Sequence, residues 1–399
     1  MSTVRPVALV GLFGVGNFGN DATLGAMLHA LSERGVRNVV VVADTPERVR
    51  QDVGVASVPI AARRRAGGPF GPLVGKTQDA LRALTIAGHA GALILPGTGA
   101  FEGVWVEAGG LPLTLCLMAV GALLRRRRLD VVAAGIDVAG SSLTRLLNGA
   151  TLRMAASVSV RDEPSADAAM SLGLRRRPRV VPDQTFALPP VAPSPVPPSG
   201  DRPRVVVGVM DYAGRGVRRP VEARDRYLGG VAELVVRLLD EGCAVHLVPG
   251  AIPDIEPMRQ VAARVAERVP GGALTVSAAR TYGEAAAEMA GARAVTASRF
   301  HTVVGALAVG TPVVPFGYGP KHEALVARFG LPPGVDVDTF EPDDLAARVM
   351  DLVARHDEFT GRIREAGRQA RAELASLYDE LVAGLPYGAG VGAAREVPA

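Results

Sequence analysis

The chain has 399 residues, of which 48% are hydrophobic and 21% are charged, and its formal net charge is +4. This length and composition exclude a disordered chain and favour an α/β protein with two domains. Aromatic residues are only 4% and are not interleaved with the arginine runs, which argues against single-stranded nucleic-acid binding. Cys116 and Cys243 lie in apolar segments without metal-ligand spacing, so we expect no disulfide framework and a cytoplasmic location.

Strand and helix patterns alternate through the first 187 residues. Residues 7–10 are an apolar strand, residues 11–19 are a glycine-rich turn, and residues 21–34 have the apolar spacing of a helix. A second strand at residues 39–42 completes a βαβ unit, whose crossover is expected to be right-handed. The alternation continues over these ranges: strand 93–95, helix 113–124, strand 131–134, helix 143–156, strand 158–160 and helix 165–172.

A proline-rich segment separates this series from a second one. Residues 188–203 contain seven prolines, so they cannot form a helix or a central strand and are expected to act as a semi-rigid linker. After the linker, strands are predicted at 205–209, 244–248, 274–276, 294–296 and 313–316. Helices are predicted at 227–240, 258–268, 282–290, 302–309, 323–328, 344–353 and 359–381.

Two consecutive series of this kind predict an α/β protein with two Rossmann-like domains and a central cleft. The domains are expected at residues 1–187 and 204–345, joined by the linker at 188–203. Residues 346–387 are expected to form C-terminal helices. The Gly/Ala-rich residues 388–399 are expected to be a flexible tail.

The turn after the first strand carries a G-x-G-x-x-G pattern at residues 14–19, and Asp44 ends the next strand. This pattern is typical of dinucleotide binding. A second interpretation is a substrate loop in which Asn17 and Asp21 hydrogen-bond sugar hydroxyls. A third is a tight turn that leads into a capped helix; for Asn20 we favour the role of a simple N-cap.

Two further turns follow strands of the first series. One contains Gly97 and Glu102, which either line the same cleft or belong to a solvated glycine-rich turn. The other begins at Arg161, followed by Asp162 and Glu163. Arg161 either pairs with one of these acids or points its planar guanidinium at a carboxylate or phosphate, which its donors match in a bidentate geometry.

Three basic side chains lie around one βα unit of the second series: Arg299, His301 and Lys321. In open α/β sheets, ligands bind outside the carboxyl ends of the strands. The arrangement therefore suits a small anion that carries more than one charge. The alternative is that Arg299 and Lys321 are solvated and that His301 caps a helix.

Several motifs occur in a fixed order along the chain. They are the glycine-rich turn at 14–21, V-R-D-E-x-S-A at 160–166, D-x-x-F at 183–186, R-x-H-x-x-x-x-A-x-x-x-G-x-P-V-V at 299–314 and Y-x-P-K at 318–321. In this order and spacing they resemble the polysaccharide pyruvyl transferase family, whose members ketalate sugars with phosphoenolpyruvate.

The resemblance implies a GT-B-like fold and a transferase that moves a pyruvyl group from phosphoenolpyruvate to a sugar, forming a ketal. The sugar would belong to a cell-surface polysaccharide or to its lipid-linked precursor. By resemblance, the donor-binding residues are Arg161, Arg299, His301 and Lys321. Of these, His301, Arg299 and Lys321 are expected to be catalytic, with His301 as the proton carrier because imidazole titrates near neutral pH.

The domain at 204–345 is then the expected donor side, and the domain at 1–187 is the expected acceptor side. On the acceptor side, the residues expected to bind the sugar are Gly16, Asn17, Asp21, Gly97 and Glu102. Phosphoenolpyruvate is expected as the co-substrate, with no further cofactor and no metal.

Three other functions stay open from the sequence: a nucleotide-sugar-dependent glycosyltransferase of GT-B type, an NAD(P)-dependent enzyme, and a non-catalytic glycan-binding protein. The arginine run at 125–128 leaves open a peripheral contact with the inner face of an anionic membrane, although a solvated helix end explains the run equally well. The identity of the acceptor sugar and the oligomeric state are not specified by the sequence.

Overall fold

The structure is a computed structural model that describes residues 5–61, 71–103, 108–194, 200–214, 220–269 and 273–386. The expected tail at 388–399 and the stretch 195–199 of the expected linker lie outside these ranges.

The chain folds into two compact units, neither of which is continuous in sequence. The first unit comprises Met1–Val15, Thr23–Leu188 and Ala370–Ala399. The second unit comprises Gly16–Ala22 and Pro189–Gln369. In this division, residues 16–22 belong to the second unit, and the last long helix is divided between the two.

The first unit is built on a parallel sheet. Its strands in the described residues are β1 (Val7–Val10), β2 (Val39–Ala43), β3 (Ser57–Pro59), β4 (Ala92–Pro96), β5 (Arg128–Ala134), β6 (Ser157–Val160) and β7 (Arg179–Val180). They lie in the order β3-β2-β1-β4-β5-β6-β7, and neighbouring strands are parallel. The chain proceeds outward in opposite directions from β1 and β4, so the topological switch point lies between these two strands.

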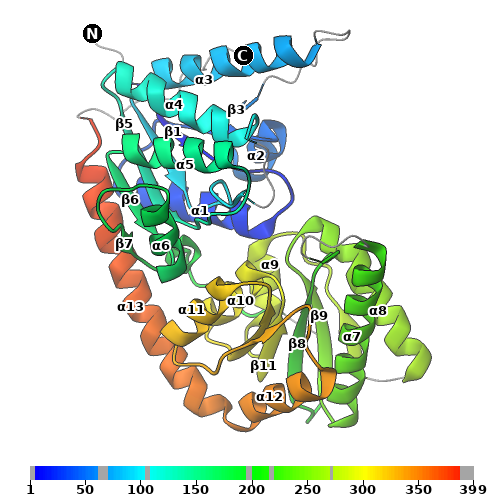
Figure 1. The fold of residues 1–399 in the computed structure, drawn as a ribbon. Coiled ribbons are helices and arrows are strands. Elements are labelled where there is room, and N and C mark those ends of the chain that lie inside the picture. Colours follow the sequence, from blue (N-terminus) through cyan, green and yellow to red (C-terminus); the bar gives the residue numbers. More distant parts are fainter. Residues whose placement is uncertain are drawn as a thin grey trace. The chain divides into compact units, whose positions relative to one another are not determined.

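Helices cover this sheet, as expected for strands that are apolar and buried along their whole length, such as β1 and β2. The helices are α1 (Phe18–Glu33), α2 (Pro46–Val53), α3 (Gly71–His89), α4 (Leu111–Leu124), α5 (Ser142–Met154) and α6 (Glu163–Ser171). Figure 1 shows α3, α4 and α5 side by side over one face of the sheet.

The second half of α13 (His356–Ala383) also belongs to the first unit. The ring of Tyr378 is buried, and its hydroxyl donates a hydrogen bond to Gln184 Oε1 at 3.3 Å. Arg34 on α1 pairs with Asp379 at 2.8 Å. Burial of the Tyr378 ring against this unit ties the C-terminal end of the helix to residues from near the other end of the chain.

The second unit repeats the architecture with a sheet in the order β10-β9-β8-β11-β12-β13, again parallel. Its strands in the described residues are β8 (Arg204–Val209), β9 (Ala244–Pro249), β10 (Leu274–Val276), β11 (Ala294–Ala297), β12 (Val313–Gly317) and β13 (Val335–Asp336). Its helices are α7 (Pro220–Asp240), α8 (Ile255–Arg268), α9 (Tyr282–Met289), α10 (Phe300–Ala308), α11 (Pro320–Arg328), α12 (Pro342–Ala354) and the first half of α13. The switch point lies between β8 and β11. The expected α/β class with two Rossmann-like units is confirmed.

The start of α1 differs from the sequence-based expectation. The helix begins at Phe18, three residues early, so Asn20 is not the N-cap but a buried residue of the first turn. Asn17 precedes the helix instead, and its Oδ1 accepts a hydrogen bond from the Gly19 N–H at 3.1 Å. Asp21 is likewise a helix residue and not a loop residue.

No helix in the described ranges combines the length and the apolar character that crossing a membrane requires.

Candidate functional site

The carboxyl ends of four strands in the second unit bring the candidate residues together. Ser298 and Arg299 follow β11, and Asp211 follows β8, so these residues flank the switch point. The segment after β9 contributes Asp254, and Lys321 lies at the start of α11 after β12. This is where ligands bind in open parallel sheets.

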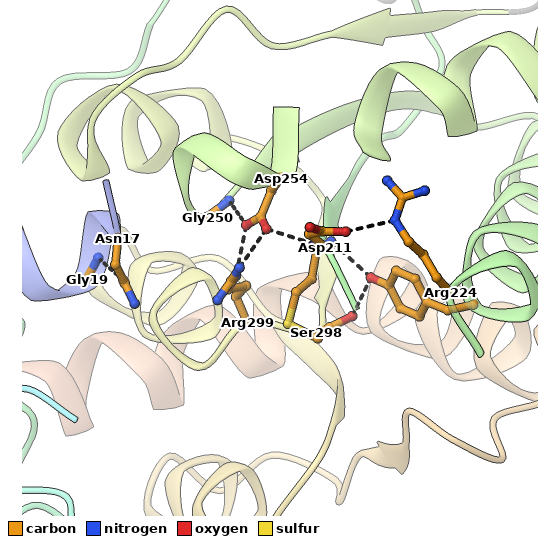
Figure 2. Close-up of polar contacts among 10 residues, drawn as sticks. Asn17, Gly19, Asp211, Arg224, Gly250, Asp254, Ser298 and Arg299 are labelled. Carbon is orange, nitrogen blue, oxygen red and sulfur yellow. Dashed lines mark hydrogen bonds and ion pairs between the residues drawn. The ribbon is translucent and has the colours of Figure 1, made fainter. Parts of the chain in front are cut away.

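Arg299 is held by a carboxylate that the sequence analysis did not single out. Its Nε and Nη2 donate to the two oxygens of Asp254 at 2.8 and 2.6 Å, which forms a bidentate ion pair (Figure 2). Asp254 has no exposed surface, and its oxygens also accept hydrogen bonds from the N–H groups of Asp211 and Gly250. Four donors thus converge on one buried carboxylate, so its position is fixed.

This pair fixes both the charge and the direction of the Arg299 guanidinium. Burial lowers the pKa of Arg299, but the hydrogen bonds and charge of Asp254 outweigh it and hold that pKa above its ordinary value. Within the described residues, Nη1 has no hydrogen-bond partner, and the side chain is 24% exposed. The pair therefore leaves Nη1 as an oriented donor that an anionic ligand can approach.

His301 lies against the N-terminal segment of the chain. The ring packs so closely on the backbone of Gly19 that a Cβ at position 19 would overlap it. The segment itself is fastened to the second unit, because the Phe18 N–H donates to the Gly250 carbonyl at 3.3 Å and Asn17 forms a β-bridge with Ala251. Gly19 is thus required by a contact, whereas Gly14 and Gly16 have positive φ values of 75° and 81° that favour glycine through the backbone.

Gly19→Ala is therefore expected to displace the His301 ring. If His301 is the proton carrier that the resemblance implies, turnover should fall by about 10²-fold, since small misplacements of catalytic groups have effects of this size. Gly25→Ala on the same helix is the matched control, because its Cβ would meet only Leu188 Cδ2, at 3.7 Å. Steady-state kinetics of both variants test the contact. Equal turnover in the two variants would remove the argument for Gly19.

Lys321 lies among aromatic rings. Its Nζ is 5.0 Å from the ring centroid of Tyr318 and 5.7 Å from that of Phe300. The Phe300 ring also packs at 5.3 Å from the His301 ring and at 5.6 Å from the His322 ring. Cation–π contacts of this kind orient an ammonium group. Phe300 therefore connects Lys321 and His301 within one cluster.

Three buried hydrogen bonds support the turn next to this cluster. His322 is buried, and its Nε2 donates to the Ser298 carbonyl at 3.1 Å. The Ser298 hydroxyl is 2.9 Å from the hydroxyl of Tyr227, which also accepts from the Met210 N–H at 3.0 Å. Burial raises the pKa of Tyr227, so this phenol stays neutral. These residues position the turn that carries Arg299.

A hollow of about 250 Å³ opens beside the cluster in the second unit. His322, Gly319 and Pro320 line one part of it, and Glu323 and Asp336 are its acidic residues. Arg299, His301 and Lys321 do not line this hollow. The hollow therefore lies next to the cationic cluster, but the charged residues that line it include two acids, Glu323 and Asp336.

The structure places Arg161 in the first unit, after the carboxyl end of β6. Its side chain is 3% exposed, and its Nη2 donates to Glu102 Oε1 at 2.6 Å. Two further carboxylates lie near: Asp162 Oδ2 is 3.5 Å from Nε, and Asp183 Oδ2 is 4.0 Å from Nη1. Gly135 makes room for the guanidinium, because a Cβ there would overlap it. Of the two acids expected as partners, Asp162 lies near Arg161, but the shortest contact of Arg161 is with Glu102.

The other expected acceptor residues fall in both units. Gly97 and Glu102 follow β4 in the first unit, where a Cβ on Gly97 would overlap the Ala133 carbonyl. Gly16, Asn17 and Asp21 belong to the second unit. The Gly16 carbonyl accepts a hydrogen bond from the Ile252 N–H at 2.8 Å. Of the four expected donor residues, the structure brings Arg299, His301 and Lys321 together in the second unit and places Arg161 in the first.

The family model for polysaccharide pyruvyl transferase matches residues 17–320, which is well over half of the chain. The chain belongs to the polysaccharide pyruvyl transferase family. The matched range includes Arg161, Asp254, Arg299 and His301; it begins within the first glycine-rich turn and ends one residue before Lys321. A comparison with curated proteins finds no match.

Solved structures with the same fold include sugar-nucleotide enzymes. A putative UDP-N-acetylglucosamine 2-epimerase from Listeria monocytogenes has a TM-score of 0.62 at 13% identity, covering 95% of this chain and 98% of its own. The UDP-GlcNAc 2-epimerase from Neisseria meningitidis, bound to UDP-GlcNAc, has a TM-score of 0.61 at 9% identity, covering 95% and 99%. The glycosyltransferase SnogD from Streptomyces nogalater has a TM-score of 0.54 at 14% identity, covering 95% and 99%. The GT-B-like fold of this pyruvyl transferase family member is therefore confirmed.

Proposed function

We propose that the protein transfers a pyruvyl group from phosphoenolpyruvate to a sugar of a cell-surface polysaccharide or its lipid-linked precursor, and that the product is a cyclic ketal. Family membership supports the transferase class. The observation that carries the donor assignment is in the second unit: Asp254 orients Arg299, and the ring of the next residue, Phe300, contacts both His301 and Lys321.

Phosphoenolpyruvate carries a carboxylate and a phosphate on neighbouring atoms, so its binding requires several fixed donors in one place. Arg299 offers Nη1, and Lys321 offers an ammonium held over two rings. Asp254 neutralises part of this positive charge while it aligns the guanidinium. Binding at the proposed donor site therefore depends on the direction of the Arg299 N–H groups as well as on the net positive charge.

In the proposed reaction, a proton is added to the methylene carbon of phosphoenolpyruvate, which becomes a methyl group and leaves positive charge on the central carbon. A sugar hydroxyl attacks that carbon and loses its proton. Inorganic phosphate then leaves with the C–O bond electrons, and a second hydroxyl attacks the same carbon and loses its proton to close the ring. His301 is the proposed proton carrier, because an imidazole can give and accept protons near neutral pH.

Arg161 remains a predicted donor ligand. Three carboxylates surround its buried guanidinium, so an anion could bind there only if it displaced Glu102. For the acceptor we propose Gly16, Asn17, Asp21, Gly97 and Glu102, with a cytoplasmic location and peripheral membrane contact through the arginines at 125–128 when the acceptor is lipid-linked.

A thermal-shift panel with phosphoenolpyruvate, nucleotide-sugars, NAD and a glycan, together with an assay for phosphate release, tests the proposal. We expect stabilisation by phosphoenolpyruvate, and phosphate release only when a glycan acceptor is present. Stabilisation and turnover by a nucleotide-sugar instead would identify the alternative, a glycosyltransferase of GT-B type. Glycan binding without any phosphate release would identify a non-catalytic binding protein.

Lys321→Ala is expected to raise the KM for phosphoenolpyruvate about tenfold, which corresponds to about 1.4 kcal/mol of lost donor binding. The chain contains two lysines, Lys76 and Lys321, so Lys76→Ala is a matched control that removes the same charge elsewhere. Titration of the donor in both variants tests the assignment, and an unchanged KM in Lys321→Ala would contradict it.

A further inference from the structure

A second group of basic residues lies in the first unit, at the amino ends of the strands, whereas Arg161 lies at a carboxyl end. A hollow of about 680 Å³ opens where β6 and β7 begin, next to the end of α5. Five arginines line it: Arg153, Arg175, Arg176, Arg177 and Arg179. No acidic residue is among its lining residues, so every charged side chain that lines the hollow is basic.

Two of these arginines have carboxylate partners that hold them in place. Arg177 donates to Glu163 and Asp167 of α6, each at 2.6 Å, and these hydrogen bonds raise the pKa of Arg177. Arg179 pairs with Glu380 of α13 at 2.9 Å. Both partners of Arg177 and the partner of Arg179 lie outside the lining of the hollow, so the rim is fixed from outside.

Arg153 is held without loss of charge. Its Nη1 donates to the Leu172 carbonyl at 3.0 Å, and a Cβ on Gly173 would lie 2.8 Å from the same nitrogen. Gly173 has a φ of 91°, which favours glycine. The turn before the arginine run is therefore shaped around the guanidinium of Arg153.

Arg175 and Arg176 are exposed, and within the described residues neither they nor Arg153 forms an ion pair with a carboxylate. Three uncompensated guanidinium groups thus line the same hollow as two that are anchored. Like charges gathered in this way repel one another unless an anion binds between them.

Apart from Ser157, the remaining lining of the hollow is apolar, with Leu152, Val158 and Leu174 among its residues. Leu152 is buried, and the other two are half-buried. An apolar wall below an arginine rim fits an anion whose phosphate groups are joined to a less polar body. Planar guanidinium groups match phosphate oxygens in a bidentate geometry.

We propose that this hollow is a binding site for phosphate-bearing anions of the diphosphate or phospholipid-headgroup class, separate from the donor cluster around Arg299. Both ligands share the phosphate oxygens that Arg153, Arg175 and Arg176 would contact. The hollow lies at the amino ends of β6 and β7, whereas Arg161 comes directly after the carboxyl end of β6. The two therefore lie at opposite ends of the strands of one sheet. A strand of four residues separates these ends by roughly 10 Å.

The experiment compares the unmodified protein with the double variant Arg175→Gln/Arg176→Gln, called the hollow variant below. The control is Arg37→Gln/Arg371→Gln, which removes the same charge from exposed positions of the first unit that do not line the hollow. Calorimetry measures the affinity for inorganic diphosphate, which represents a free phosphate ligand. Co-sedimentation with vesicles of phosphatidylglycerol, against vesicles of phosphatidylcholine, measures the headgroup source.

We expect the affinity for diphosphate, for phosphatidylglycerol vesicles or for both to fall at least about tenfold in the hollow variant and less than about twofold in the control. Loss with only one ligand identifies the source. Absence of binding to both ligands by the unmodified protein, or an equal loss in the two double variants, would overturn the proposal. Phosphate release from phosphoenolpyruvate with a water-soluble glycan should be unchanged in the hollow variant, so this test is independent of the donor site.

Discussion

His301→Ala is expected to lower kcat for phosphate release by about 10²–10⁴-fold, which is the usual contribution of a positioned acid–base group. The imidazole packs against Gly19 and the Phe300 ring and is only half-buried, so its removal should leave the second unit folded. Steady-state kinetics over a range of phosphoenolpyruvate concentrations, together with a thermal melt, separate the two effects.

His29→Ala is the control for this prediction. His29 lies on α1 within 3.4 Å of Glu33, and its side chain is 38% exposed. It should therefore behave as the unmodified protein in both measurements. Near-normal kcat in His301→Ala with an intact melt would show that another group moves the proton.

Asp254→Ala should have the largest effect on the architecture of the donor cluster. The substitution leaves Arg299 without its bidentate partner and removes the acceptor for the N–H groups of Asp211 and Gly250. Breaking a buried ion pair from one side costs about 3 kcal/mol of the free energy of unfolding. The freed guanidinium also loses its direction, so we expect the KM for phosphoenolpyruvate to rise at least about tenfold.

Urea denaturation followed by a signal from the second unit measures the first effect, and donor titration measures the second. Asp344→Ala is the control, since its pair with Arg348 is an exposed i,i+4 contact at 2.9 Å, which contributes about 0.5 kcal/mol or less. If Asp254→Ala and Asp344→Ala were equally stable and bound the donor equally well, the bidentate pair would have no role in the site.

The alternation of apolar strands and helices was sufficient to predict the α/β class, because each buried parallel strand is a short continuous apolar run. The prediction failed where that signal is weak. The strands β3, β7 and β13 have two or three residues each and lie at or near sheet edges, so they lack a buried apolar run. The helices α2 and α3 were also missed; α2 is polar along most of its length.

In the candidate site, the residues that are neighbours in sequence were predicted, and a partner distant in sequence was missed. Arg299, His301 and Lys321 could be identified because they lie in one short stretch around a predicted strand. Asp254 lies 45 residues before Arg299, and no local pattern indicates which acid an arginine will meet at that distance. Its one signal is its position at the start of a helix that follows a buried strand.

Glycine roles were predicted only in part. The pattern at residues 14–19 correctly indicated backbone conformations that favour glycine, since Gly14 and Gly16 have positive φ. The contact of Gly19 with His301 joins residues 282 positions apart and has no counterpart in the local sequence. The pairing of Arg161 with Glu102 was likewise hidden, because nearby Asp162 and Glu163 were the obvious partners by sequence distance.

The two units are interleaved along the chain, and this affects how the protein is made. The ribosome releases the strands of the first unit early, but the half of α13 that buries Tyr378 against them is synthesised last. Domains that are continuous in sequence can fold one after another during translation. Here the first unit completes its packing only after the second unit has been synthesised. Truncation before residue 370 should therefore expose apolar surface on the first unit, although most of that unit lies before residue 189.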